Sequence, residues 1–143
     1  MLVKEVMTPE VQFIRSDDTI KQAATRMGQL SIGAIPVIAG DEAVGMLTDR
    51  DIVLRSVAQG LDPEKHKVME VFSKGIKSCN EENDLKTAAG LMQDQQIRRL
   101  LVKNNEGKVT GIVSLGDLAL NVEHHMSGKV LRKVSEPSVP ASA

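Results

Sequence analysis

The chain contains an internal repeat, and this repeat constrains the fold more than any other feature of the sequence. Glu5-Val6-Met7-Thr8 returns 65 positions later as Glu70-Val71-Phe72-Ser73. After Asn104-Asn105-Glu106-Gly107 the offset becomes 66, as one extra residue in a turn would produce. Chance does not keep several blocks in register, so we interpret the chain as a duplicated unit. The other matched blocks are residues 19–27 with 84–92, 32–37 with 97–102, and 45–51 with 111–117.

Hydrophobic periodicity predicts the same order of elements in both copies: strand, helix, strand, strand, helix. In the first copy Ile20, Ala23, Ala24 and Met27 fall at i, i+3, i+4 and i+7, which is one stripe of a helix. The first copy is predicted to have strands at 11–14, 34–38 and 43–47, a helix from 20, and a second helix that starts at 48–51 and carries Ile52, Val53 and Val57. The second copy is predicted to have strands near 76–79, 100–102 and 109–113, and helices at 85–95 and from 115 to about 124.

These elements predict an α/β (α+β) fold of two β-α-β-β-α repeats. One half alone cannot bury both faces of its elements, so the two halves are expected to pair. The first repeat is placed at residues 1–60 and the second at 68–125, with a linker at 61–67. The remaining residues, 126–143, carry Ser, Pro and Lys without a period and are predicted to form a flexible tail.

Composition excludes several classes of function. The chain of 143 residues has two Phe and no Tyr or Trp, so the core must be aliphatic and base-stacking platforms for single-stranded nucleic acid are not expected. A formal net charge of −1 gives no reason to expect a nucleic-acid or anionic membrane partner. The longest stretch without charge, residues 27–40, is shorter than the roughly 20 residues of a membrane-spanning helix. The first residues show no signal-peptide pattern, and the single cysteine excludes an internal disulfide, so a cytoplasmic location is expected.

The pattern Gly-x-x-(Thr/Ser)-x-x-Asp occurs at residues 45–51 and 111–117. Its hydroxyl and carboxylate are typical of a capping box at the start of a helix, which is a structural role. The same carboxylate could accept hydrogen bonds from the two vicinal hydroxyls of a ribose, and a glycine at the strand end would let backbone approach a ligand. A carboxylate has enough lone pairs for both roles, so the two interpretations are compatible. The pairs are Thr48 with Asp51, and Ser114 with Asp117.

On these blocks the sequence resembles the paired cystathionine β-synthase (CBS) domain module, here standing alone. The resemblance covers about residues 3 to 122 and rests on the repeated blocks at 5–8, 32–37 and 45–51, with 97–102 and 111–117 as partners. It implies that the two repeats pack sheet to sheet about a pseudo-two-fold axis. It also implies that AMP, ADP, ATP or S-adenosylmethionine occupies one or both clefts between them as a regulatory ligand, with no required cofactor. Two modules of such proteins commonly form a homodimer.

The resemblance further implies two sets of ligand-binding residues. The segment before the first strand of each copy is expected to contribute to the cleft that holds the carboxylate of the other copy, which places Ser73 near the second cleft. The first cleft is expected to use Thr8, Val11, Gln12, Arg98, Arg99, Leu100, Gly111, Ser114 and Asp117. The second is expected to use Ala34, Ile35, Pro36, Gly45, Thr48, Asp51, Ile76 and Lys77.

The two clefts differ in charge. The second copy has Arg98-Arg99 where the first has Gly33-Ala34. A guanidinium can hold a phosphate through two hydrogen bonds, so the cleft with Asp117 is the better predicted phosphate site. The alternative is that these arginines are a solvated pair at a helix end, where cations are favoured in any case.

Other reactive residues have simpler interpretations. His66 lies in a Lys-rich linker, and His124-His125 are adjacent instead of four apart, so no metal site is predicted. Cys79 stands where the first copy has Ile14 and is expected to be a buried thiol. No Ser-His-Asp or Cys-His set accompanies the carboxylates, so an enzyme is not predicted. The sequence thus favours a regulatory module for adenosine compounds, and it leaves open a protein partner that receives the signal. The alternative is an interaction or structural module with vestigial clefts.

Overall fold

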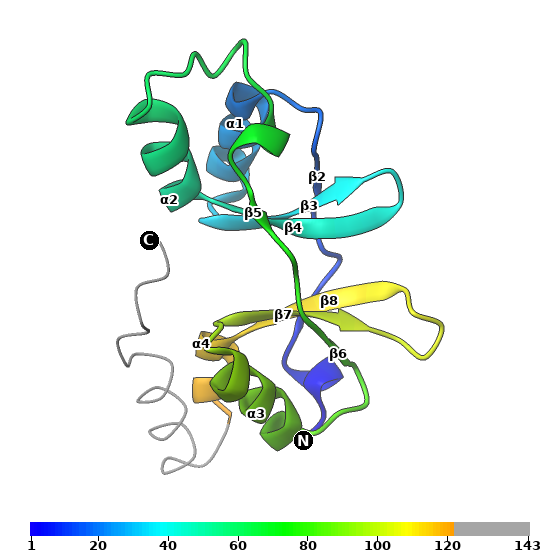
Figure 1. Cartoon of the computed structure of the whole chain (residues 1–143). Helices are drawn as coiled ribbons and strands as arrows, with labels where there is room; N and C mark the ends of the chain where they lie inside the picture. Colours follow the sequence, from blue (N-terminus) through cyan, green and yellow to red (C-terminus); the bar gives the residue numbers. More distant parts are fainter. Residues whose placement is uncertain (122–143) are drawn as a thin grey trace. The chain divides into compact units, whose positions relative to one another are not determined.

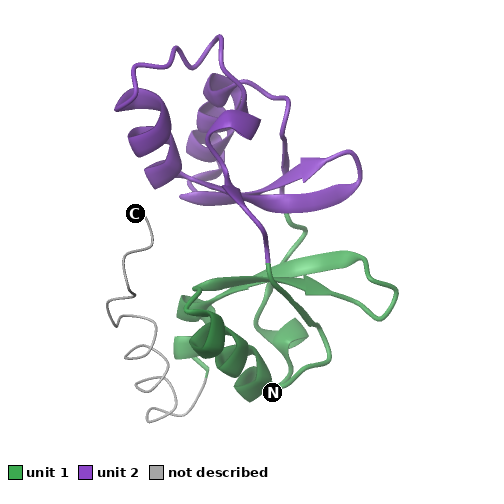
Figure 2. Ribbon diagram, viewed as in Figure 1, with its two compact units in different colours: residues 1–11, 77–143 green, residues 12–76 purple. Residues whose placement is uncertain are grey.

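The computed structural model describes residues 1–121, so the predicted tail at 126–143 and the end of the predicted last helix lie outside the described residues. The chain divides into two compact units (Figure 2). Unit 1 contains residues 1–11 and the chain from residue 77 onward, and unit 2 contains residues 12–76. The units therefore differ from the sequence repeats, because each unit takes its leading segment from the other repeat.

Unit 2 contains strands β2 (Ile14–Arg15), β3 (Ala34–Ala39), β4 (Glu42–Thr48) and β5 (Ser73–Lys74), helices α1 (Ile20–Leu30) and α2 (Asp49–Ile52), a π-helical segment η2 (Val53–Val57) and a 3-10 helix η3 (Val68–Glu70). Its four-stranded sheet has the order β2-β3-β4-β5. β2 is parallel to β3, and the other pairs are antiparallel. Helices α1 and α2 lie on one side of this sheet (Figure 1).

Unit 1 contains a 3-10 helix η1 (Val3–Glu5), strands β1 (Thr8–Pro9), β6 (Ser78–Asn80), β7 (Arg99–Lys103) and β8 (Val109–Ser114), and helices α3 (Leu85–Gln95) and α4 (Leu115–Ala119). The sheet order is β1-β8-β7-β6, again with one parallel pair, β6 with β7. Helices α3 and α4 lie on one side of it (Figure 1). The predicted α/β fold of two repeats is confirmed, and each repeat supplies most of a mixed four-stranded sheet.

The duplication extends to details of the backbone. Helix α1 begins at the cap Thr19, whose hydroxyl accepts the amide of Gln22 at 3.1 Å, and α3 begins at Asp84, whose carboxylate accepts the amide of Thr87 at 2.8 Å. Both helices end on a left-handed residue that is not glycine, Ser31 at φ 55° and Gln96 at φ 53°. Four residues lie between the paired Ile38 and Ala43, and five lie between the equivalent pair Lys103 and Val109, so the extra residue that changes the offset lies in the turn between β7 and β8, as predicted.

Two short strands were not predicted from the sequence. Through them each repeat adds one strand to the sheet of the other repeat, and we call them the exchanged strands. β1 pairs with β8 and β5 pairs with β4, both antiparallel. The residues just ahead of these strands are buried in the receiving core: Val3 in unit 1 and Val68 with Val71 in unit 2. A two-residue strand has no periodicity that a sequence pattern could reveal, so only the matched blocks at 5–8 and 70–73 marked these segments.

Each unit has its own aliphatic core, as the shortage of aromatic residues predicts. Met27 and Met92 are buried in helical stripes, as expected. Three apolar residues of the predicted helices are exposed. Ala24 is exposed, because the α1 stripe is limited to Ile20, Ala23 and Met27. Val53 and Val57 are also exposed, and both lie in the π-helical segment that follows the first four residues of the predicted second helix. Within residues 1–121, no helix is long and apolar enough to cross a bilayer.

Gly45 and Gly111 are required by the close approach of the exchanged strands. A Cβ atom on Gly45 would overlap the carbonyl oxygen of Ser73 and lie 2.8 Å from ring carbons of Phe72. A Cβ atom on Gly111 would overlap the Met7 sulfur and lie 2.9 Å from the carbonyl oxygen of Thr8. The space predicted for a ligand beside these glycines is therefore occupied by the chain's own backbone.

We expect Gly45→Ala to lower the free energy of unfolding by about 1–3 kcal/mol or more, because the new methyl group meets backbone that cannot rotate away. Gly111→Ala should cost less, since the Met7 side chain can move. Gly28→Ala is the matched control: this helical glycine has nothing within 4 Å of an added Cβ, so the change should stabilise by about 0.5–1 kcal/mol. Urea unfolding of the three variants tests the order. Equal stability of Gly45→Ala and Gly28→Ala would contradict the assigned role of the exchanged strand.

Candidate functional site

The motif at residues 45–51 forms a closed set of hydrogen bonds at the junction of β4 and α2. The amide of Asp51 donates to the Thr48 hydroxyl at 3.0 Å, and the amide of Thr48 donates to Oδ2 of Asp51 at 3.0 Å. This is the predicted capping box, and it holds the Asp51 carboxylate at the start of the helix. The Asp51 residue is only 7% exposed. A buried carboxylate needs hydrogen-bond partners, and the exchanged segment supplies more of them.

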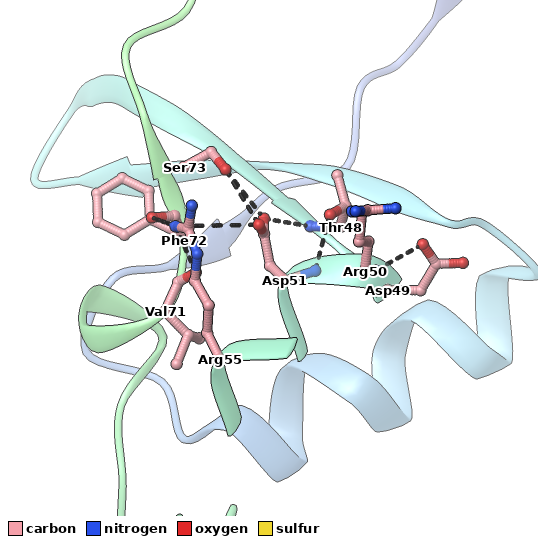
Figure 3. Close-up of polar contacts among 8 residues, drawn as sticks. All are labelled: Thr48, Asp49, Arg50, Asp51, Arg55, Val71, Phe72 and Ser73. Atoms are coloured by element: carbon pink, nitrogen blue, oxygen red, sulfur yellow. Dashed lines mark hydrogen bonds and ion pairs between the residues drawn. The ribbon is translucent and has the colours of Figure 1, made fainter. Parts of the chain in front are cut away.

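One partner, Ser73, comes from the segment that leads into the second repeat, and the other, Arg55, comes from the π-helical segment of the first repeat (Figure 3). The Ser73 hydroxyl donates to Asp51, 3.1 Å from Oδ1 and 3.3 Å from Oδ2. Nη1 of Arg55 lies 4.0 Å from Oδ1 of Asp51 and donates to the carbonyl oxygens of Val71 at 3.3 Å and Phe72 at 3.2 Å. Arg55 therefore ties this carboxylate to the backbone just before Ser73.

The corresponding motif in unit 1 has the same capping box and fewer further contacts. The amide of Asp117 donates to the Ser114 hydroxyl at 3.1 Å, and the amide of Ser114 donates to Oδ2 of Asp117 at 2.8 Å. Within residues 1–121, Oδ1 of Asp117 accepts no hydrogen bond. Thr8 is exposed on β1, and the described structure has no hydrogen bond between it and Asp117. The half-buried Asp117 thus keeps acceptor capacity that Asp51 has used.

Arg98 and Arg99 lie at the start of β7, next to this second motif. Arg99 is opposite Ser114 in the β7–β8 register, and the carbonyl oxygen of Arg98 accepts the amide of Leu115 at 2.7 Å. Both arginines are exposed, and no residue in the described part of the chain pairs with either guanidinium. Helix α3 ends at Gln95, so these residues follow the helix end by three and four positions. That distance weakens the alternative of a pair held by the helix dipole.

The predicted site residues separate almost cleanly between the two units. Unit 1 holds the predicted first set except Gln12, and unit 2 holds the second set except Lys77. Gln12 instead accepts a hydrogen bond from Arg26 within unit 2. The side chains of Ile35 and Leu100 are fully buried in the cores of their units, so only their backbone could reach a ligand.

Sequence analysis missed Arg55, the cation beside Asp51. Its spacing of four residues from Asp51 in a predicted helix was the available signal, because side chains at i and i+4 are neighbours. Its bonds to the Val71 and Phe72 carbonyls had no sequence signal, since they depend on where the exchanged segment lies.

The other reactive groups take no part in either motif. Cys79 lies in the unit 1 core, and burial raises the pKa of its thiol to about 11, so the group stays protonated at neutral pH. Nδ1 of His66 lies 2.9 Å from Oε1 of Glu70. Among the described residues, no three His, Cys, Asp or Glu side chains gather closely enough to hold a metal ion. His124 and His125 lie outside those residues.

Comparison with known proteins identifies the repeated unit. The family model described as "CBS domain" matches this chain twice, at residues 3–57 and 68–124. CBS domain-containing protein YhcV of Bacillus subtilis (strain 168) is 41% identical over 138 residues, which are 96% of this chain and 97% of YhcV. A match of that extent leaves no room in YhcV for a separate catalytic domain.

Two solved structures extend the comparison. The hexameric CBS-CP12 protein from bloom-forming cyanobacteria has a TM-score of 0.72 and 27% sequence identity, covering 86% of this chain and 72% of that chain. CBSX2, solved in complex with AMP, has a TM-score of 0.66 and 21% identity, covering 83% of this chain and 93% of CBSX2. At that identity the second likeness shows the fold alone.

The difference between the two motifs predicts different costs for losing each carboxylate. Asp51→Ala should lower the free energy of unfolding by about 1–3 kcal/mol, because it removes a buried cap and leaves the Ser73 hydroxyl without its acceptor. Asp117→Ala removes a more exposed cap with fewer partners and should cost about 0.5–1 kcal/mol. Urea denaturation followed by circular dichroism measures both. A larger loss for Asp117→Ala would contradict the described asymmetry.

Proposed function

Because the chain belongs to the CBS domain family, with two copies of the domain spanning residues 3–124, we propose that it is a regulatory module that binds an adenosine-containing ligand through Asp117. The observation that carries the proposal is the unused acceptor capacity of this carboxylate. Oδ2 of Asp117 accepts one hydrogen bond and Oδ1 accepts none within the described residues. Two vicinal ribose hydroxyls need one acceptor site on each oxygen, and Asp117 has both.

Arg98 and Arg99 are the proposed phosphate-binding groups. They are exposed cations without a partner in residues 1–121, on the same unit as Asp117 and next to Ser114 in the sheet register. A guanidinium can donate two parallel hydrogen bonds to a phosphate, and such charge-assisted bonds are stronger than neutral ones. Charge therefore favours AMP, ADP or ATP over S-adenosylmethionine at this place. The complex of CBSX2 with AMP supports the ligand class.

The proposed output is a change of conformation or of assembly, without a chemical reaction. A ligand can shift such an equilibrium only if it binds the two states with different affinity. The hexameric CBS-CP12 protein shows that a related protein assembles into oligomers. For this chain we propose a homodimer of CBS modules whose stability responds to the ligand.

The second candidate is a protein-interaction module without a nucleotide ligand. One observation favours it: Val53, Leu54 and Val57 are 54%, 43% and 65% exposed on the π-helical segment of unit 2. Residues three and four positions apart on a helix are neighbours, so Val57 lies beside Leu54 and Val53, and exposed apolar groups that gather in this way mark contact sites on proteins. The two candidates are distinguished by ligand binding.

Thermal unfolding of the purified protein with AMP, ADP, ATP and S-adenosylmethionine tests the ligand. At 100 times its dissociation constant a ligand should stabilise by about 2.7 kcal/mol, which is roughly 5–10 °C in midpoint for a chain of this size. The shift should disappear in Asp117→Ala and persist in Asp94→Ala, an exposed acidic residue of α3 that serves as the control. Absence of any shift with the unchanged protein would favour the interaction module.

The phosphate role has a separate test. The double variant Arg98→Ala, Arg99→Ala should weaken AMP binding by about 10-fold or more, because charge-assisted hydrogen bonds are lost, and should leave adenosine binding nearly unchanged. Lys86→Ala on α3 removes an exposed cation elsewhere on unit 1 and should change neither affinity. Isothermal titration calorimetry measures these affinities. Equal weakening of AMP and adenosine would show that the two arginines do not contact phosphate.

A further inference from the structure

We propose that the hydrogen bond from Ser73 prevents the Asp51 carboxylate from binding the hydroxyls of a ribose. Each chain would then bind one nucleotide although the binding motif occurs twice. The proposal rests on the proposed function of Asp117 and adds a residue that determines the number of sites. It starts from the contacts of the Ser73 hydroxyl (Figure 3).

The lone pairs of Asp51 are used where a ribose would need them. Each carboxylate oxygen has about two acceptor sites. Oδ2 of Asp51 accepts the Thr48 amide at 3.0 Å, and the Ser73 hydroxyl, which has one proton to donate, lies 3.3 Å from the same oxygen. The Ser73 hydroxyl also lies 3.1 Å from Oδ1 and therefore bridges the two oxygens. Vicinal hydroxyls would have to bind across these same two oxygens, so Ser73 competes with them directly.

Ser73 is held in this position by the backbone. Ser73 is opposite Met46 in the β4–β5 register, and the absent side chain of Gly45 lets the strand approach. Arg55 donates to the carbonyl oxygens of Val71 and Phe72, immediately before Ser73. The hydroxyl is therefore a fixed partner of Asp51, and a ligand would gain little by displacing it.

The second copy of the motif shows that the fold does not require this contact. Thr8 is opposite Ile112 in the β1–β8 register, the position equivalent to Ser73 opposite Met46. In the described structure no hydrogen bond joins Thr8 to Asp117. Asn121, the counterpart of Arg55, donates to the backbone carbonyl oxygen of Asp117 at 2.9 Å and does not contact its carboxylate. The same backbone arrangement thus leaves one carboxylate open and the other closed.

Titration calorimetry with AMP of the full chain and its variants tests the proposal. The unchanged protein should bind one AMP per chain. Ser73→Ala leaves Asp51 with the acceptor sites that Asp117 has, so this variant should bind two, with the added site at least about 10-fold tighter than any binding there in the unchanged protein. Ser73→Thr keeps the hydroxyl and should bind one. The double variant Ser73→Ala, Asp51→Asn should return to one, which assigns the added site to Asp51.

Each outcome decides one of the two proposals. Two sites in the unchanged protein, or one site in both the unchanged protein and Ser73→Ala, would overturn the role of Ser73 and leave the function of Asp117 intact. If the unchanged protein binds no AMP and Ser73→Ala binds one through Asp51, the role of Ser73 holds and the function of Asp117 fails. Absence of binding in both proteins overturns both. Thermal unfolding of each variant without AMP shows that it is folded.

Discussion

The close antiparallel pairing of two short strands, β5 with β4 and β1 with β8, is the contact on which the rest of this structure depends. Each strand belongs by sequence to one repeat and completes the sheet of the other. Two residues of strand contribute little alone. The segments stay in place because Val3 and Val68, just ahead of the strands, are fully buried in the receiving cores. Gly45 and Gly111 allow the approach, since a side chain at either position would meet backbone.

The same strand pairing also determines which hydroxyl groups lie near the aspartate of each motif. The aspartate of each motif is positioned locally, by a capping box with Thr48 or Ser114 at the start of a short helix. The exchanged strand then places Ser73 beside Asp51 and Thr8 in the equivalent register of unit 1. A hydroxyl that arrives in this way can either occupy the carboxylate or leave it free. The structure contains one case of each.

The two copies therefore differ in polar contacts, although the backbones of α1 and α3 and of their β-hairpins agree. Helix bounds, left-handed helix ends and strand bulges recur at equivalent positions. Asp51 is buried and shares its oxygens with Ser73 near Arg55, whereas within residues 1–121 the carboxylate of Asp117 accepts only the Ser114 amide of its own capping box. The proposed division follows from this difference: one motif has become a structural contact of its unit, and the other keeps the acceptor sites and the neighbouring arginines that a nucleotide needs.

The repeat, the order of elements, the aliphatic cores and the capping boxes were predictable from the sequence. These features depend on local periodicity and on residue pairs three or four positions apart, which the sequence contains directly. The bounds of α3 agree with the prediction for the same reason.

Only the tertiary structure decided which carboxylate remains open. That property depends on contacts between residues far apart in the sequence, such as Ser73 with Asp51 and Arg55 with the Val71 carbonyl oxygen. The backbone geometry after Ile52 was also decided by the tertiary structure, because the sequence pattern predicts a helix there and contains no sign of its change to π-helix at Val53. The sequence by itself determined that the motif exists twice. The side-chain contacts of the exchanged strands determined that the two copies are not equivalent: Ser73 bonds to Asp51, whereas Thr8 in the same register makes no hydrogen bond to Asp117 within residues 1–121.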